Sequence, residues 1–374
     1  MQEFIEALTK SEVASDDIRT PSKTHSIFKH LAEGVDGITI SESLSTIEVF
    51  QRGVDYVVSC DDAQPVMSHL MLDDSQVEIF GKEYKVRRRG NAVVIYSDID
   101  LGISNDQSLA SRLNTFLVSI TSGGGISFLG SPSLSLTVRL VDLIAKALPE
   151  SSCNVFFDGK KYVMSEYDVE TNQVLNSTSR ASLSELMLCV DLSPYKYVFV
   201  ESFSGFEDVQ GAVNLAASGK RVIYVKNSVS SVYALYSSML VIDTHVLSPL
   251  FSGAFFVNSL AYVKGATVPK VQFQQHNSFN KWGSLKTSPL RDELILTDPQ
   301  RGLLEVAKHE LIISEGITPS KAVSKWISEK VNPLDFASNL RLDQGWISIA
   351  DEAAIAVRDE SVTFDQVLGK ISLI

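Results

Sequence analysis

Residues 123–140, GGGISFLGSPSLSLTVRL, have the layout with which a phosphate-binding loop begins. A glycine cluster leads into a short apolar run, then into a turn rich in Gly, Pro and Ser, and then into a helical pattern. The motif G-x-x-x-x-G-K-[ST] places a lysine directly before a hydroxyl residue. Gly130 and Thr137 have the spacing of the motif, but Leu136 stands at the lysine position and Ser135 at the second glycine. The stretch therefore has the spacing of a nucleotide loop without its charge.

The missing lysine matters because phosphoryl transfer is catalysed mainly by positioning and charge neutralisation. Loss of one charge-assisted contact costs about 1.5–3 kcal/mol in binding, and in a transition state ~10²–10³ in rate. Pro132 removes one N–H from any phosphate cradle. Thr137 could still bind Mg²⁺, but a single hydroxyl is a weak site. Leu136 instead extends the apolar face of Leu140 and Ile144, so we expect it to pack a helix on a sheet.

The elements around this stretch alternate between strand and helix. Short apolar runs typical of buried parallel strands occur at Ile126–Leu129, Asn154–Phe157, Tyr195–Glu201 and Arg221–Val225. A helix is expected at Asp208–Ala217, between the last two of these runs. Strands at this spacing with intervening helices predict a wound, largely parallel sheet.

Both ends of the chain differ from this central pattern. Before it, a helical piece at Thr24–Glu33 precedes β-like runs at Gly37–Ile40, Thr46–Tyr56, Val77–Arg88 and Asn91–Tyr96. Small polar residues at 104–106 predict a domain boundary, followed by a helix at 107–120. After it, a strand is expected at Phe255–Val263, and helices at Gly302–Ile313, Pro319–Glu329 and Gly345–Val357.

The composition narrows the class of protein. The chain has 374 residues, of which 44% are hydrophobic and 21% charged, as in a soluble globular protein. This length predicts two domains, or one larger domain with an extension. A net charge of −12 argues against a general nucleic-acid surface, and no apolar run reaches the roughly 18 residues of a membrane span. The cysteines are far apart and the histidines lack ligand spacing, so we expect reduced thiols, no metal site and a cytoplasmic setting.

The order of the segments resembles that of the secretion and type IV pilus motor ATPases (GspE/PilT-like). Near the amino terminus, D-G-I-T-I-S-E at Asp36–Glu42 resembles the family's A-S-D-I-H-I-E segment. The run through Phe50, Arg52, Val54 and Asp55 resembles its R-F-R-I-D-G strand.

Two later regions extend the resemblance over most of the chain. V-F-V-E-S-F-S-G at Val198–Gly205 resembles I-L-I-G-E-I-R-D, the strand that carries the family's Walker B glutamate. Leu342–Gly345, Ile349–Ala353 and Val362–Leu368 resemble its closing G-M-x-T-L-x-D-D-A…G-x-T-S-x-E-E-V region. Each motif is eroded, and the order of the pieces carries the resemblance.

The resemblance implies an α/β chain of two domains. A small α+β (PAS-like) domain would occupy residues 1–104. A RecA-like P-loop domain with a wound, largely parallel sheet would occupy 105–374 and end in a helical region at 299–374.

The resemblance also assigns positions to the family's site. The vestigial nucleotide loop comprises Gly130, Ser131, Pro132, Ser133, Leu134, Ser135, Leu136 and Thr137. Ser202 corresponds to the catalytic glutamate, and Asn227 or its neighbour Lys226 to the histidine box. Counterparts of the family's nucleotide-contacting arginines are Arg52, Arg87, Arg88 and Arg89; the last three equally fit a solvated strand end.

Two carboxylates remain as fallback catalytic groups. Asp158 falls near the family's acidic box, but an Asp before Gly159 also suits a simple turn. Glu201 precedes Ser202, and because neighbouring side chains of a strand point to opposite faces, we expect Glu201 to point away from the site. A solvated or paired strand-end carboxylate is the other interpretation of Glu201.

Loss of the lysine, the glycine, the glutamate and the histidine together favours a degenerate motor subunit that does not hydrolyse ATP. By resemblance it would be a structural or regulatory ring component of a pilus, conjugation or secretion apparatus, cytoplasmic or peripheral at the inner membrane. Its partners would be its own copies in a ring such as a hexamer, an active paralogous ATPase, or an inner-membrane platform. No cofactor and no direct nucleic-acid contact are expected.

Two other interpretations stay open. The chain could be an active ATPase that uses ATP and Mg²⁺ through Thr137, Asp158 and Glu201. It could also be an α/β protein unrelated to motors.

Overall fold

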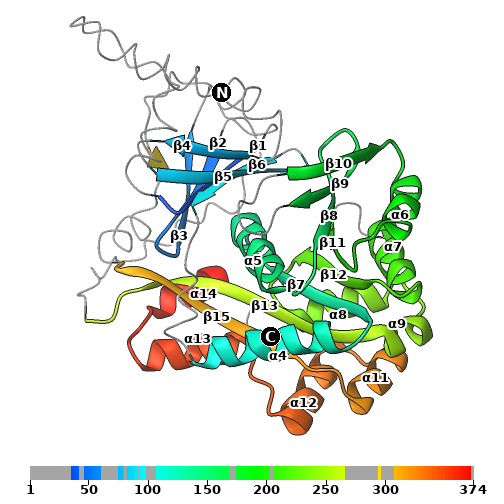
Figure 1. The fold of residues 1–374 in the computed structure, drawn as a ribbon. Helices are drawn as coiled ribbons and strands as arrows, with labels where there is room; N and C mark the ends of the chain where they lie inside the picture. Colours follow the sequence, from blue (N-terminus) through cyan, green and yellow to red (C-terminus); the bar gives the residue numbers. More distant parts are fainter. Residues whose placement is uncertain are drawn as a thin grey trace, which may run out of the picture.

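The structure is a computed structural model. It describes residues 35–41, 46–59, 75–79, 82–90, 92–97, 107–167, 174–202, 206–265, 294–295 and 307–371. The helix expected at Thr24–Glu33 and the boundary expected at 104–106 lie outside the described residues. Two sheets dominate this part of the chain, and helix α5 (Leu134–Ala147) lies between them (Figure 1).

The first sheet, here called sheet A, is antiparallel throughout, in the order β14-β3-β2-β1-β6-β5-β4. Its strands are β1 (Gly37–Ser41), β2 (Thr46–Gln51), β3 (Val54–Ser59), β4 (Ser75–Ile79), β5 (Lys82–Arg89), β6 (Ala92–Ser97) and β14 (Leu294–Ile295). The last strand comes from far later in the chain, so sheet A is not formed by the amino-terminal segment alone.

Two runs that we expected as single strands, Thr46–Tyr56 and Val77–Arg88, are antiparallel strand pairs, and the second is divided between β4 and β5. Thr46–Tyr56 is divided between β2 and β3 at the turn Arg52–Gly53, and both turn residues have positive φ, 51° and 80°. A Cβ atom on Gly53 would lie 2.3 Å from the Leu260 carbonyl oxygen of the second domain. Glycine is therefore required by the turn and by its close approach to that domain.

The second sheet, sheet B, has the order β10-β9-β8-β11-β12-β7-β13-β15. Its central strands β8, β11, β12, β7 and β13 pair in parallel, and antiparallel strands border them at both ends. The bounds are β7 (Gly125–Ser131), β8 (Ser152–Phe157), β9 (Tyr162–Tyr167), β10 (Val174–Arg180), β11 (Tyr197–Glu201), β12 (Arg221–Asn227), β13 (Phe251–Tyr262) and β15 (His309–Ile317). The predicted parallel centre is confirmed.

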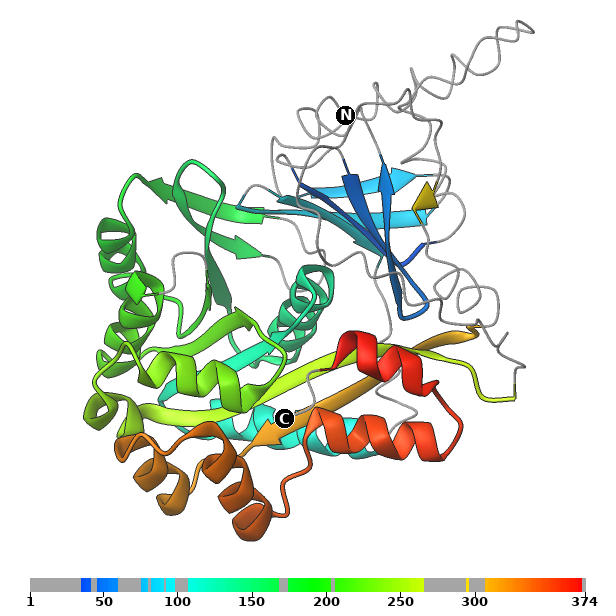
Figure 2. The same ribbon diagram turned by 180° about the vertical axis from the view of Figure 1, so that it is seen from behind.

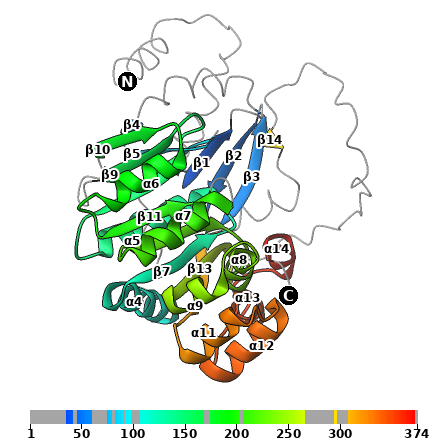
Figure 3. The same cartoon turned by 90° about the vertical axis from the view of Figure 1, so that its right-hand side faces the viewer.

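Helices cover both faces of sheet B. Alternate strand residues separate into two apolar clusters, because successive side chains of a strand point to opposite faces. One cluster joins the sheet to α4 (Gln107–Ser122) and α5. The other joins it to α6 (Leu183–Asp191), α7 (Phe206–Ala217), α8 (Ser231–Met239), α9 (Thr244–Leu250) and the last helices of the chain (Figure 3).

The last helices are α11 (Lys321–Ser328), α12 (Pro333–Gln344), α13 (Ile349–Arg358) and α14 (Phe364–Lys370), which lie together along one side of the molecule (Figure 2). Ser and Asn side chains cap α11, α12 and α13, and Gly345 ends α12 with φ 60°. No helix of the described residues is long and apolar enough to cross a membrane.

The helix predicted at Gly302–Ile313 is wrong where the structure describes it, because His309–Ile313 belongs to β15. This strand pairs antiparallel with β13 along its length. Its β-branched residues Ile312 and Ile313 are buried on opposite faces of sheet B. The tertiary pairing and the β-branched side chains outweigh a helix-like spacing that is ambiguous over so short a run.

Candidate functional site

The carboxyl ends of the parallel strands meet at the edge of sheet B that faces sheet A. This edge is where ligands bind in open α/β sheets. A cavity of about 300 Å³ opens there, lined by residues from β5, β8, β11, β12 and α5: Arg89, Gly90, Leu134, Thr137, Phe156, Phe157, Glu201, Ser202, Val225 and Asn227. The structure therefore brings together Thr137, Glu201, Ser202, Asn227 and Arg89 from the predicted site.

The junction of β7 and α5 is shorter than a phosphate loop. β7 continues through Ser131, and α5 begins at Leu134, so only Pro132 and Ser133 lie between strand and helix. Leu134 to Thr137 are already helical. A phosphate loop needs a run of backbone N–H groups that turn toward the ligand. In the span 130–137, the loop between strand and helix is reduced to two residues, and the other N–H groups that could face a ligand belong to the first turn of α5.

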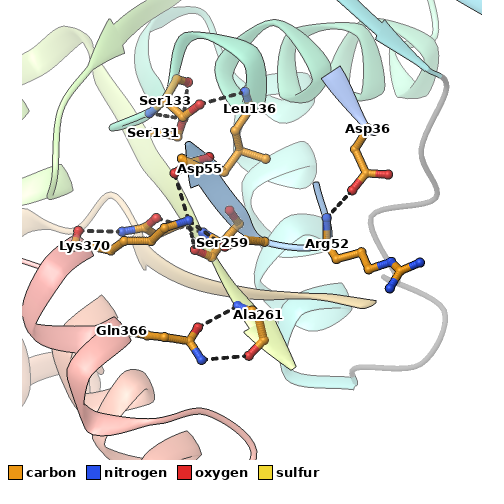
Figure 4. A network of polar contacts seen from close by, with 12 residues as sticks. Asp36, Arg52, Asp55, Ser131, Ser133, Leu136, Ser259, Ala261, Gln366 and Lys370 are labelled. Atoms are coloured by element: carbon orange, nitrogen blue, oxygen red, sulfur yellow. Dashed lines mark hydrogen bonds and ion pairs between the residues drawn. The ribbon is translucent and has the colours of Figure 1, made fainter. Parts of the chain in front are cut away.

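The hydroxyl groups of this junction are bonded to one another. The Ser131 hydroxyl donates to the Ser133 carbonyl oxygen (2.7 Å) and accepts from the Ser133 N–H (3.2 Å). The Ser133 hydroxyl caps α5 by accepting from the Leu136 N–H (3.5 Å; Figure 4). The Thr137 hydroxyl lies 2.9 Å from the Ser131 hydroxyl, 2.8 Å from the Ser133 carbonyl oxygen and 3.1 Å from Asn227 Oδ1. The Thr137 hydroxyl thus has three protein oxygens within hydrogen-bonding distance of its single hydrogen.

Leu136 and Gly130 have structural roles in the junction. Leu136 is 1% exposed and packs in the cluster that contains Leu140 and Ile144. Gly130 lies within β7, and a Cβ atom there would stand 1.9 Å from the Lys226 carbonyl oxygen and 2.9 Å from the Phe256 ring. Strand packing therefore accounts for a glycine at the first motif position without any phosphate.

Glu201, at the end of β11, is held by a cation from sheet A. Its Oε2 atom lies 2.5 Å from Nε of Arg89, and both residues are buried. The Arg89 guanidinium also lies 4.2 Å from the centre of the Phe156 ring, a cation–π contact. The prediction that Glu201 points away from the site is wrong: Glu201 and Ser202 line the same cavity. β11 ends at Glu201, so the alternation of a strand does not extend to Ser202.

The positions around Ser202 and Asn227 carry no catalytic carboxylate or histidine. Ser202 donates its N–H to the Val225 carbonyl oxygen (2.8 Å), joining the end of β11 to β12. Asn227 accepts from Thr137, and the Lys226 ammonium donates to the Ser237 hydroxyl (2.5 Å). Burial lowers the pKa of Lys226, and the Asp208 carboxylate opposes that shift. Burial, reinforced by Asp208, raises the pKa of Tyr224 beside Ser202.

Asp158 lies in the β8–β9 turn and does not line the cavity. Its Oδ1 atom accepts from the N–H groups of Lys160 (2.8 Å) and Lys161 (2.7 Å), and Gly159 has φ 92°. This is the geometry of an Asx turn. Of the two interpretations of Asp158, the structure favours the simple turn.

The predicted arginines separate into different places. Arg87 and Arg89 of β5 face the second domain and are 0% and 7% exposed, so the interpretation of a solvated strand end is wrong for both. Arg87 lies 3.7 Å from Asp142 Oδ2, while Arg88 between them is only half-buried. Arg52 is exposed at the β2–β3 turn, where its side chain donates to the Ala307 carbonyl oxygen (3.2 Å).

Sequence reasoning missed the acceptor for the β5 cations, Asp142 of α5. Its Oδ2 atom accepts from the Tyr96 hydroxyl (2.6 Å) and lies 3.5 Å from Lys85 Nζ. Burial, more than the adjacent Asp142 charge, raises the pKa of Tyr96 well above its usual range. The sequence does contain one indication: Asp142 is a charged residue within the apolar run LVDLIA, which predicts a polar or charged partner for this face of the helix. In the described part of the chain, no three His, Cys, Asp or Glu side chains gather as a metal site.

Solved structures of similar fold exist. The ATPase DotB of Legionella pneumophila superposes with a TM-score of 0.54 at 9% identity, over 94% of this chain and 96% of DotB. The Yersinia pseudotuberculosis ATPase DotB gives 0.50 at 9% identity, over 94% and 95%. The pilus retraction motor PilT, solved with bound ADP, gives 0.48 at 13% identity, over 92% and 95%. The chain has the two-domain fold of DotB.

This likeness confirms the fold that the sequence resemblance implied, an antiparallel sheet domain followed by a mostly parallel sheet domain. No protein-family model and no curated protein sequence matches the chain. At such low identity the likeness establishes the fold alone and says nothing of ATP binding or hydrolysis.

Proposed function

We propose that this chain is a non-hydrolysing subunit of a motor-ATPase-like assembly, with a structural or regulatory role in a pilus, conjugation or secretion apparatus. The observation that carries the proposal is the β7–α5 junction. A junction of two residues, closed by its own hydroxyls and followed by a core leucine, offers no lysine and few free N–H groups to a triphosphate.

The end of β11 supports the same conclusion. A catalytic carboxylate must accept a hydrogen bond from the attacking water. The Glu201 carboxylate is instead ion-paired through Oε2 with Arg89, which lowers its strength as a base and partly neutralises both groups. An arginine that neutralises a protein carboxylate contributes little charge to a phosphate.

The DotB-like fold and the sequence resemblance support the assembly partners that we propose. We propose a ring of identical copies, such as a hexamer, or a mixed ring with an active paralogous ATPase, docked on an inner-membrane platform from the cytoplasmic side. Light scattering of the purified chain, alone and mixed with the candidate paralogue, tests this part. A strictly monomeric chain in both samples would contradict it.

The second candidate is an active ATPase with rearranged chemistry. One observation favours it: the cavity of about 300 Å³ still contains Thr137 and Glu201. Titration of ATP with Mg²⁺ by calorimetry, followed by a phosphate-release assay, separates the two candidates. Micromolar binding with turnover would establish the ATPase, whereas an absence of both supports the non-hydrolysing subunit.

A further inference from the structure

Charged side chains and one neutral tyrosine are buried where sheet A meets the second domain. We call this set the interdomain seam, and it comprises Lys85, Arg87, Arg89 and Tyr96 from sheet A with Asp142 and Glu201 from the second domain. Each of the six is less than 9% exposed. Opposite charges therefore face each other across a domain boundary from which water is largely excluded.

A buried ion pair contributes little net stability to an interface, because the cost of desolvating its charges offsets most of their attraction. Its strength is in specifying register, since a shift that separates the partners inside the protein leaves charges buried without compensation. Adhesion at this seam comes from apolar contacts between the domains, where Val94 and Tyr96 pack against Val138 and Leu134. The apolar contacts of the seam would survive a small shift of one domain along the other, whereas the ion pairs would be broken by it.

The seam passes through the cavity at the carboxyl ends of the strands. Arg89 reaches from β5 to Glu201 and stacks on Phe156, and the N–H of the next residue, Gly90, donates to the Phe157 carbonyl oxygen (2.7 Å). The pair therefore joins sheet A to the ends of two parallel strands at the place where a nucleotide would sit.

A second contact between the domains lies at the β2–β3 turn. The Lys370 ammonium of α14 donates to the Gly53 carbonyl oxygen (2.7 Å) and to the Ser259 carbonyl oxygen (3.2 Å), and lies 2.8 Å from Asp55 Oδ2 (Figure 4). Gly53 itself approaches the backbone of β13 closely. Two separated contacts are enough to oppose rotation of one domain about the other.

From this geometry we infer that the interdomain seam is a register lock, which holds the two domains in one orientation whether or not nucleotide is present. The inference goes beyond the proposed function, since a chain could fail to hydrolyse ATP and still have domains that move.

Distance measurement between spin labels on the two domains tests the lock. Cys60 and Cys189 are replaced by serine, Cys153 is left in the core, and labels are attached at Val57→Cys and Leu192→Cys, positions that are 37% and 79% exposed. The lock predicts one narrow distance distribution that does not change when ATP and Mg²⁺ are added. A broad distribution, or one that shifts with ATP, would overturn the inference.

Variants separate the lock from general rigidity. Arg89→Ala and Asp142→Asn are each expected to widen the distribution, and Arg89→Lys, which keeps the charge but not the planar stacking, to widen it less. Lys196→Ala, which breaks an exposed ion pair within the second domain, is the matched control and is expected to leave the width unchanged. If Arg89→Ala does not fold, Arg89→Lys and Asp142→Asn carry the test. Wild-type width in all folded seam variants would disprove the lock.

The same samples distinguish failure of the lock from failure of the proposed function. Phosphate release is measured on the labelled protein. Turnover at an unchanged distance would remove the non-hydrolysing role and leave the lock standing. An ATP-dependent shift without turnover would remove the lock alone.

Discussion

The ends of β7 and β11 lie at the same edge of sheet B, yet they are closed in different ways. At the end of β7, the closure is local and mostly neutral: Ser131, Ser133 and Thr137 bond to one another, and Leu136 enters the core. At the end of β11, the closure is ionic and comes from another domain, through Arg89 on Glu201. Polar groups at this edge are thus bonded either by the helix that follows the strand or by the domain that covers it.

The difference between the two closures has energetic consequences. Apolar packing and hydroxyl bonds lose a graded amount of stability when one member is removed. A buried ion pair loses more, because its remaining member stays buried and charged. Substitutions at the two strand ends should therefore differ in how much they lower the free energy of unfolding.

The largest loss is expected for Glu201→Ala. Arg89 would remain buried without this carboxylate, which lowers the free energy of unfolding by about 3–5 kcal/mol. Urea denaturation measures the change. Lys196→Ala removes one member of an exposed pair with Glu150 and should cost at most about 1 kcal/mol. Equal effects of the two substitutions would show that the end of β11 is not held by a desolvated charge.

Leu136→Ala is expected to lower the free energy of unfolding by about 2–5 kcal/mol, since it removes a side chain from a close-packed cluster. Thermal and urea unfolding both report this loss. The conservative variant Leu136→Met should cost less than about 1.5 kcal/mol. If alanine at this position were neutral, Leu136 would not be the core residue that defines the end of β7.

Thr137→Val keeps the shape of the side chain and removes the hydroxyl that joins α5 to Ser131 and Asn227. A loss of about 1–3 kcal/mol is expected, because these buried polar groups lose a partner. Thr115→Val on α4 is the control, since its hydroxyl bonds only within its own helix. A Thr137 effect no greater than that of Thr115 would mean that the hydroxyl network is incidental.

The smallest effect on ATP turnover is expected from restoring the motif, although a lysine in place of the buried Leu136 also lowers the free energy of unfolding, so the folding of the variant is checked first. Leu136→Lys supplies the missing charge at the end of β7 but leaves serine at position 202 and the Glu201 carboxylate paired with Arg89. ATP turnover in this variant should stay at background in a phosphate-release assay. Measurable turnover from this single substitution would show that the β11 end is not closed to chemistry.

Sequence reasoning succeeded where the deciding contacts are local. Leu136, Leu140 and Ile144 repeat at helical spacing, so the pattern alone placed Leu136 in the core. The parallel strands of sheet B read as short apolar runs because both of their faces are buried. The glycine that follows Asp158 likewise indicates a turn, and the structure has an Asx turn there.

It failed where distant segments meet. The partner of Glu201 lies on β5 of the other domain, and no spacing rule links the two residues. Asp142 also lies on the other domain from its cations on β5, and no spacing rule links them. Without these carboxylates, the sequence favoured a solvated strand end for Arg87 and Arg89. Residues 309–313 were predicted as helix because only the pairing of β15 with β13 makes them a strand. The packing of Leu136 could be predicted from the sequence, whereas the hydroxyl network around Thr137 and the contacts between the domains could not.

Calorimetric titration of the purified chain with ATP and Mg²⁺ tests the central claim most directly. The end of β7 has no lysine, and the Glu201 carboxylate at the end of β11 is ion-paired with Arg89. The account therefore predicts no saturable heat in the micromolar range and no phosphate release. Micromolar binding of ATP followed by turnover would contradict it.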